Sequence, residues 1–365
     1  MRNAHRRCAR RSTGDQENGG RANHVLSAHL PPQPVFPPRQ AGDVGLQPER
    51  HSRLRALFPR SGGGGHAHLS RFPPAQPVNE STDTLKTADG LDLFVRRWQD
   101  DAVPHQWTFV IVHGLGEHEG RYQHLADWFT PLGATVYAMD LRGHGRSGGQ
   151  RGHAPSLDAL LDDIDAVVVR ARSTSGGPLV LIGHSFGGLL AVAYALDRPA
   201  HLDKAVFSAP ALLPRVKVPA WKRALAGVLP TIAPRASFAN EIDPRVLSHD
   251  PAVAPAYVSD PLVHNRITAG LYASTLARGD ALLARAPELR VPFLLLHGRD
   301  DQVVDPIGSQ RFFAGATAAG RAFCLYPGFY HEIFNELEHE TVFQDIESWL
   351  TQRTDAHLTG WNPPP

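Results

Sequence analysis

A serine stands between two glycines in the segment Gly183-His-Ser185-Phe-Gly187, a pattern typical of a serine nucleophile. The apolar run 179–182 before it has the composition of a buried strand, and small apolar residues continue at helical spacing from 186 to 195. A serine on such a tight turn needs neighbours that lack a Cβ atom, and the two glycines meet this need. We therefore predict that Ser185 is a catalytic nucleophile between a strand and a helix.

A serine hydroxyl is a weak nucleophile until an imidazole accepts its proton and a carboxylate orients that imidazole. The loop after the predicted strand 291–296 holds three carboxylates, those of Asp300, Asp301 and Asp305. His331 follows the apolar run 322–326, so serine, acid and histidine come in the chain order of α/β-hydrolases. Each of these residues could instead be an ordinary loop residue, because the chain has 20 histidines and 36 acidic residues.

Ester or amide cleavage also needs backbone N–H groups that face the developing oxyanion. Phe186 directly follows the serine, and its N–H is the first candidate. The second is the N–H of Leu115, which lies between two glycines after the predicted strand 107–113. The alternative for this second segment is a simple glycine-rich turn.

Several segments resemble the monoacylglycerol lipases, a family of serine hydrolases. They are His113-Gly-Leu-Gly-Glu-His118, Gly120-Arg-Tyr122, Asp140-Leu-Arg-Gly-His-Gly-Arg-Ser147, Gly183-His-Ser-Phe-Gly-Gly188, Asp260-Pro-Leu262, Val291-Pro-Phe-Leu-Leu-Leu-His-Gly298 and Tyr330-His331. The resemblance covers about residues 80 to 352. It implies an α/β-hydrolase fold: a mostly parallel central sheet, helices on both faces, and a helical cap insertion.

The resemblance also implies roles for individual residues. It places the nucleophile at Ser185, the acid at Asp301 rather than Asp300, and the base at His331. The oxyanion donors are then Leu115 and Phe186, and Glu117 and Arg121 match polar positions at the glycerol end of the pocket. The chain departs from the mammalian enzyme at Phe334, where that enzyme has histidine, and at Val304, where it has cysteine.

The implied enzyme is a carboxylic ester hydrolase of lipid metabolism. It would cleave monoacylglycerols or lysophospholipids through an acyl-enzyme and release a fatty acid and, from a monoacylglycerol, glycerol. The alternatives are another triad enzyme (carboxylesterase, thioesterase, acyltransferase, perhydrolase or aminopeptidase) and a non-catalytic binding protein on the same scaffold. Dehalogenases and epoxide hydrolases are disfavoured, because they resemble this fold but carry aspartate where Ser185 stands.

Length and composition predict one enzyme domain with appended tails. The chain has 365 residues, of which 42% are hydrophobic, and no run of the ~18 apolar residues that would span a bilayer. Its two cysteines, Cys8 and Cys324, indicate neither a disulfide framework nor a metal cluster. We expect no cofactor, no metal, a lipid ester as substrate, and a cytoplasmic location with peripheral membrane contact through the cap.

The first 77 residues differ from the rest in composition. They hold twelve arginines, no lysine, four acidic residues and ten prolines, which leaves 25 basic and 32 acidic residues in the remainder. Such a segment buries too little apolar surface to offset its ordering entropy, so we predict a disordered extension over 1–77. A transit peptide or a nucleic-acid arm is one interpretation. The absence of methionine between Met1 and Met139 favours an overlong gene model with an initiator near Val78, and we expect no nucleic-acid partner.

The remaining segments predict how the domain is organised. Further strands are expected at 91–98, 134–139 and 204–208, and helices at 122–132 and 156–172, the latter with Asp158, Asp162, Asp163 and Asp165 outward. Alternating strands and helices indicate a mostly parallel sheet. Core segments are predicted at 78–210 and 286–355, a cap at 211–285 and a tail at 356–365.

Prolines divide the predicted cap into short helical pieces. One helical face combines Trp221, Leu225, Val228 and Leu229, beside the basic residues Arg215, Lys217, Lys222 and Arg223. This face could be a lid that contacts lipid, or it could pack against the core.

Overall fold

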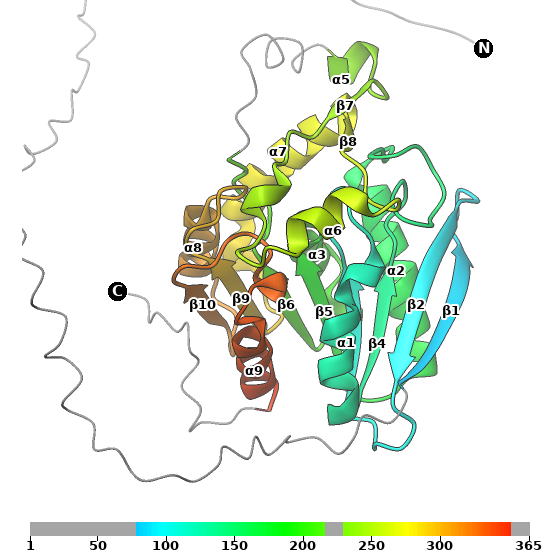
Figure 1. Cartoon of the computed structure of the whole chain (residues 1–365), viewed down its shortest axis with the longest axis vertical. Coiled ribbons are helices and arrows are strands. Elements are labelled where there is room, and N and C mark those ends of the chain that lie inside the picture. The colour runs from blue at the N-terminus through cyan, green and yellow to red at the C-terminus, as the bar shows by residue number, and fades with distance from the viewer. Residues whose placement is uncertain (1–77, 216–228, 352–365) are drawn as a thin grey trace, which may run out of the picture. The chain divides into compact units, whose positions relative to one another are not determined.

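The computed structural model describes residues 78–215 and 229–351, and eight strands of this part form one sheet (Figure 1). The strand order is β1-β2-β4-β3-β5-β6-β9-β10. The strands are β1 (Asn79–Lys86), β2 (Asp92–Gln99), β3 (Trp107–Val112), β4 (Ala134–Met139), β5 (Leu179–His184), β6 (Lys204–Ser208), β9 (Phe293–Gly298) and β10 (Ala322–Tyr326). From β4 to β10 neighbouring strands are parallel, and β1 and β2 join this sheet antiparallel at one edge.

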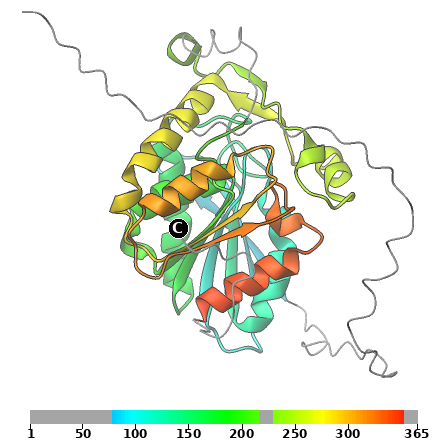
Figure 2. The same ribbon diagram turned by 90° about the vertical axis from the view of Figure 1, so that its left-hand side faces the viewer.

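Helices cover both faces of the sheet and bury two apolar layers (Figures 1 and 2). On one face, α1 (Gln123–Phe129) and α9 (His339–Leu350) pack through Phe129 and Phe343. On the other face lie α2 (Leu157–Thr174), α3 (Phe186–Asp197) and α8 (Pro306–Gly315). Because β4, β5, β9 and β10 are buried along their whole length, their sequences read as continuous apolar runs.

The chain between β6 and β9 forms an insertion above the carboxyl ends of the parallel strands (Figure 1). Its described elements are α5 (Leu229–Ile232), β7 (Ser237–Ala239), α6 (Val253–Ser259), β8 (Arg266–Thr268) and α7 (Ala269–Arg285). The short strands β7 and β8 pair antiparallel as a separate two-stranded sheet. Most of the predicted lipid-contacting face, including Trp221 and Leu225, lies outside the described residues, as do the predicted extension 1–77 and tail 356–365.

The predicted fold class, a mostly parallel sheet with helices on both faces, is confirmed. The predicted strands 134–139 and 204–208 coincide with β4 and β6 at both ends, and the apolar run 322–326 coincides with β10. Strand β1 was not predicted, because it is an exposed edge strand whose sequence, NESTDTLK, is almost entirely polar.

The expectation that Asp163 faces outward is wrong. Its side chain is 1% exposed and accepts hydrogen bonds from Arg142 at 2.5 and 2.7 Å. Arg142 belongs to the loop after β4, so the pair fastens that loop to α2. Helical spacing alone could not show this, because it does not reveal whether an acidic side chain meets a cation from a distant segment or faces solvent.

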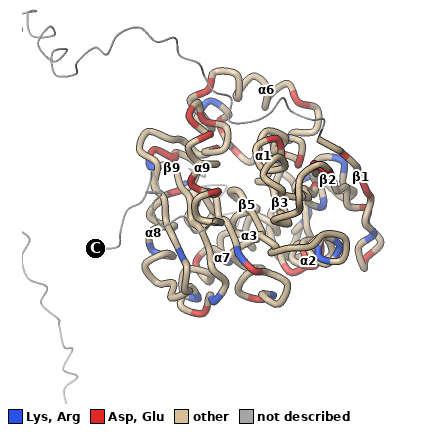
Figure 3. The backbone as a smooth tube through the Cα atoms, turned by 90° about the horizontal axis from the view of Figure 1, so that it is seen from below, with Lys and Arg blue, Asp and Glu red and all other residues tan. Residues whose placement is uncertain are grey.

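None of the helices in the described part of the chain is long and apolar enough to cross a membrane. Figure 3 shows basic and acidic positions interspersed along the backbone in this view.

We predict that Asp163→Ala lowers the free energy of unfolding by about 3 kcal/mol or more, because it leaves the buried Arg142 guanidinium with too few partners. The control is Asp162→Ala on the same helix, since Asp162 is 66% exposed and pairs with Arg198 at the surface. That variant should lose less than about 1 kcal/mol. Urea unfolding of both variants measures the difference, and equal losses would contradict the structural role of the Arg142–Asp163 pair.

Candidate active site

Ser185 occupies a strained turn between β5 and α3. Its backbone has φ 54° and ψ −116°, a conformation that a residue with a Cβ atom rarely adopts. A Cβ on Gly187 would lie 2.1 Å from the carbonyl oxygen of Val112, and one on Gly183 would lie 2.4 Å from that of Gly187. The glycines thus let the start of α3 approach β3 and β5, and the serine side chain is left at the carboxyl end of the sheet.

The structure brings Ser185, His331 and Asp301 together. Ser185 and His331 are 146 residues apart in the sequence, and Asp301 and His331 are 30 apart. The distance from His331 Nε2 to Ser185 Oγ is 2.8 Å, and that from His331 Nδ1 to Asp301 Oδ2 is 2.7 Å. Since a carboxylate only accepts, Nδ1–H donates to Asp301 and Nε2 accepts from the serine hydroxyl. This is the arrangement in which an imidazole can take a proton from serine.

Asp301 is held by four hydrogen bonds in a fully buried position. Oδ2 accepts from His331 and from His297 Nε2 at 3.0 Å, and Oδ1 accepts from the backbone N–H groups of Val303 and Val304 at 2.7 and 2.9 Å. Asp300, by contrast, is exposed. Of the carboxylates in this loop, the structure therefore places that of Asp301 against His331.

Burial and charge set the protonation of the pair. Burial by itself would raise the pKa of Asp301, but the charge of His331 and the hydrogen bonds from His297 and His331 hold it far below its usual range. Burial by itself would lower the pKa of His331, yet the charge and hydrogen bond of Asp301 raise it above the ordinary value of 6.5. Asp301 is thus ionised at neutral pH, and His331 titrates above the pH at which a free imidazole does.

The two predicted oxyanion donors lie at the same place as the serine. Leu115 and Phe186 both line the pocket that contains Ser185. Among the described residues, neither N–H donates to a backbone carbonyl in the turns and loops. A hydrogen bond connects the loop that carries Leu115 to the insertion, since the N–H of His264 donates to the carbonyl of Gly116 at 2.8 Å.

Glu117 and Arg121 lie beside this loop, but they are engaged with protein groups. Glu117 accepts from the Gly114 N–H at 2.6 Å and the Tyr122 hydroxyl at 2.8 Å, and Arg121 donates to Glu117 at 2.5 Å. Arg121 also donates to both carboxylate oxygens of Glu332. Neither Glu117 nor Arg121 is among the residues that line the apolar pocket, so their predicted glycerol contact stays a prediction.

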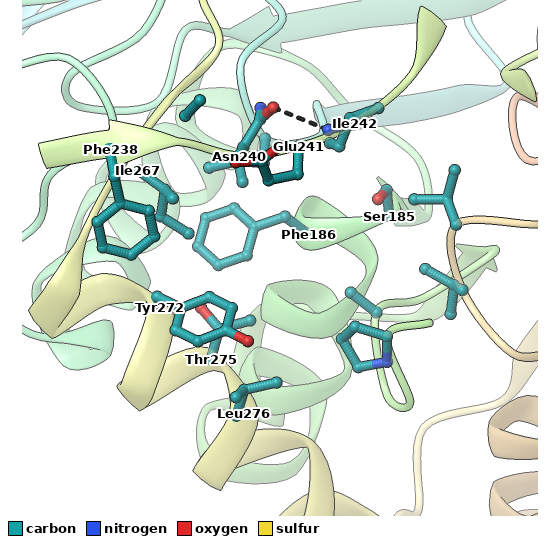
Figure 4. A pocket seen from close by; sticks show the side chains of 16 residues that line it. Ser185, Phe186, Phe238, Asn240, Glu241, Ile242, Ile267, Tyr272, Thr275 and Leu276 are labelled. Carbon is teal, nitrogen blue, oxygen red and sulfur yellow. Dashed lines mark hydrogen bonds between the residues drawn. The ribbon is translucent and has the colours of Figure 1, made fainter. Parts of the chain in front are cut away.

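An apolar pocket of about 760 Å³, including the part open to solvent, begins at Ser185 (Figure 4). Its walls come chiefly from the insertion, with Phe238 and Ile267 on one side and Tyr272, Thr275 and Leu276 of α7 across from the serine. Val303 and Val304, which follow the acid, complete the wall. Val304, one of the two departures from the mammalian pattern, therefore faces the pocket. Phe334, the other, is 2% exposed and packs near His184.

Three residues of the site were not predicted from the sequence. His297, the penultimate residue of β9, donates to Asp301 and its Nδ1 pairs with Ser309 Oγ at 2.7 Å. The ring of His184 lies 4.9 Å from that of His331, and burial together with the His331 charge lowers its pKa to about 4. Glu332 directly follows the base. Their only sequence signal is that each is adjacent to a predicted catalytic segment.

His118, Glu119 and Asp140 are close enough for their ligand atoms to share a metal ion. Protein groups already satisfy them: Arg96 and Arg146 bind Glu119, and Asp260 binds His118 at 2.8 Å. Backbone N–H groups of Glu119 and Arg146 donate to Asp140. The cluster is best explained as structural, since it fastens the loop after β3 to the loop after β4.

If Asp301 orients His331, Asp301→Asn should lower kcat by roughly 10⁴-fold, because the imidazole is then held in the wrong tautomer. The neutral base is the active form, so kcat/KM of the parent should fall on the acid side with a midpoint above 6.5. In Asp301→Asn the charge that raises the pKa of His331 is gone, and this midpoint should move to lower pH. Asp300→Asn is the control; a larger effect of that variant would assign the acid to Asp300.

Comparisons with known proteins identify the family of this chain. Residues 103–338 match the family model described as serine aminopeptidase, S33. A monoacylglycerol lipase of Mycolicibacterium smegmatis is 36% identical over 69% of this chain and 90% of its own. The crystal structure of Paleococcus ferrophilus monoacylglycerol lipase shares 37% identity at a TM-score of 0.66, covering 71% of this chain and 98% of its own.

An uncharacterized abhydrolase domain-containing protein of Dictyostelium discoideum is also 36% identical over 76% of this chain, which spans only 30% of that longer protein. The family model covers most of the described residues, and two relatives above 30% identity are matched over nearly their whole length. The chain belongs to the monoacylglycerol lipase family of α/β-hydrolases and is a carboxylic ester hydrolase.

Proposed function

We propose that this protein hydrolyses monoacylglycerols to fatty acid and glycerol, with Ser185 as nucleophile, His331 as base and Asp301 as orienting acid. The observation that carries the proposal is the chain of short contacts from Ser185 Oγ through His331 to Asp301, at the mouth of an apolar pocket. The similarity to enzymes named monoacylglycerol lipase supports the substrate class.

The proposed mechanism uses these three side chains and the two backbone N–H groups. Ser185 Oγ attacks the acyl carbonyl carbon while His331 Nε2 takes its proton, and the resulting oxyanion accepts hydrogen bonds from the Leu115 and Phe186 N–H groups. The ester C–O bond then breaks as His331 returns the proton to the glycerol oxygen. A water molecule, deprotonated by His331, attacks the acyl-enzyme, and fatty acid leaves as Ser185 regains its proton.

The insertion is proposed as the cap that receives the acyl chain. The apolar walls of the pocket come mainly from residues within 211–214 and 238–276, and hydrocarbon burial there contributes about 0.8 kcal/mol per methylene. A pocket of this composition favours long acyl groups over short polar ones. Membrane contact through the cap stays a prediction, because most of the residues expected to make it lie outside the described part of the chain.

We expect kcat/KM to be higher for a monoacylglycerol than for the matching di- and triacylglycerols, a lysophospholipid, and the methyl ester of the same fatty acid. Ser185→Ala should reduce kcat by roughly 10⁶-fold on every substrate. Purified parent and variant, assayed side by side, provide the measurement. Preference for the lysophospholipid would change the substrate class, whereas turnover by Ser185→Ala within tenfold of the parent would refute the nucleophile.

Leu276→Trp should shorten the preferred acyl chain. Leu276 is 39% exposed at the pocket wall, so a larger side chain has room to enter the cavity without disrupting the core. Each methylene that it excludes should cost ~0.8 kcal/mol, or roughly fourfold in kcat/KM. A p-nitrophenyl ester series from acetate to palmitate measures this, with Leu276→Met as the volume-matched control. A uniform loss at all chain lengths would show that Leu276 does not contact the acyl chain.

A further inference from the structure

Two buried carboxylates share one guanidinium beside the serine and the histidine. Arg121 donates from Nη1 to Glu117 Oε2 at 2.5 Å and to Glu332 Oε1 at 2.8 Å, and from Nη2 to Glu332 Oε2 at 2.7 Å. The three side chains are 13%, 5% and 4% exposed for Arg121, Glu117 and Glu332. We refer to this group as the Glu117–Arg121–Glu332 bridge.

The bridge reaches both segments that the proposed mechanism requires. At one end, Glu117 Oε1 accepts from the N–H of Gly114, the residue before Leu115. At the other end, Glu332 directly follows His331, and the side-chain amide of Asn335 donates to its Oε2 at 2.8 Å. A continuous set of hydrogen bonds therefore connects the oxyanion loop to the loop that carries the base.

The bridge carries a net charge of −1. Burial by itself would raise the pKa of both glutamates, but the charge of Arg121 lowers each below its ordinary value. Burial by itself would lower the pKa of Arg121, which the two carboxylates instead raise far above its ordinary value. Two ionised carboxylates and one guanidinium are thus held together, away from solvent, next to the base.

His331 meets few other charges in the described residues. Asp301 faces its Nδ1, Glu332 and Glu117 are the next negative groups, and Arg121 lies between these two. The nearby His184 is neutral at physiological pH, because burial and the His331 charge hold its pKa at about 4. When His331 takes the serine proton, the resulting imidazolium therefore has a second source of negative charge besides Asp301.

We propose that Glu332 is a positioning residue, which acts through Arg121 and Glu117 to hold the base loop against the oxyanion loop and to favour the protonated form of His331 during catalysis. This inference rests on the proposed triad mechanism. It assigns Glu117 and Arg121 to the positioning of the catalytic groups rather than to contact with glycerol.

The test is the pH dependence of kcat and KM for Glu332→Gln. We expect the acid-side midpoint of kcat/KM to move to lower pH, because a negative charge near His331 is removed while the shape is kept. We expect kcat to fall roughly tenfold with KM little changed. A tenfold loss corresponds to a change of about one in the pKa of His331, because the imidazolium formed during catalysis is then less stabilised. The fall should be the same for a monoacylglycerol and for the methyl ester of its fatty acid.

Glu336→Gln is the matched control, since Glu336 belongs to the same segment and is 2% exposed, but bonds His249 and the Tyr330 N–H instead of Arg121. This variant should leave the acid-side midpoint in place. Glu332→Asp keeps the charge and should also keep that midpoint while lowering kcat, and it provides the readout if Glu332→Gln does not fold.

An unchanged midpoint in Glu332→Gln, or a shifted one in Glu332→Asp, would overturn the inference. A loss confined to the monoacylglycerol would also overturn it and would assign the bridge to glycerol recognition. Ser185→Ala in the same assays distinguishes a failure of the triad proposal from a failure of the positioning role of Glu332. If that variant retains turnover, the triad proposal fails; if only the Glu332 variants behave unexpectedly, the triad stands and the positioning role does not.

Discussion

The site depends on keeping one carboxylate ionised where water cannot reach it. Asp301 is fully buried, and burial alone would favour its neutral form. Two imidazoles and two backbone N–H groups replace the lost hydration. His297 lies near the end of β9, Val303 and Val304 follow that strand, and His331 lies in the loop after β10. The segments that hold the carboxylate thus follow two adjacent parallel strands.

The turn at Ser185 is a second constraint, because its backbone conformation is energetically unfavourable. Residues held in sparsely populated backbone conformations cost about 1–3 kcal/mol each. Around Ser185 this strain is offset by satisfied hydrogen bonds: its N–H donates to the Ser208 carbonyl at 2.9 Å, and its own carbonyl accepts from Leu189 and Ala211. The same bonds connect β5, β6 and the start of the insertion, so the turn is held by the elements that also form the pocket.

The central strands and the site segments could be predicted because their signals are local. Buried parallel strands appear as apolar runs, and the elbow glycines and the Ser, Asp, His order are visible in the chain. Features that depend on partners far away in the sequence could not be predicted from it. Spacing could not distinguish Asp301 from Asp300, and it could not show that Asp163 meets Arg142 or that Arg121 joins Glu117 to Glu332. Strand β1 gave no apolar signal, because both of its faces are solvated.

The pocket and the reactive groups are encoded in separate parts of the chain. The proposed nucleophile, acid and base follow strands β5, β9 and β10, whereas most of the described pocket wall comes from the chain between β6 and β9. Substitutions in that stretch can reshape the wall without altering the strand ends. The breadth of substrates can therefore change independently of the reaction, and exchanging this segment between relatives is a direct route to engineered chimeras.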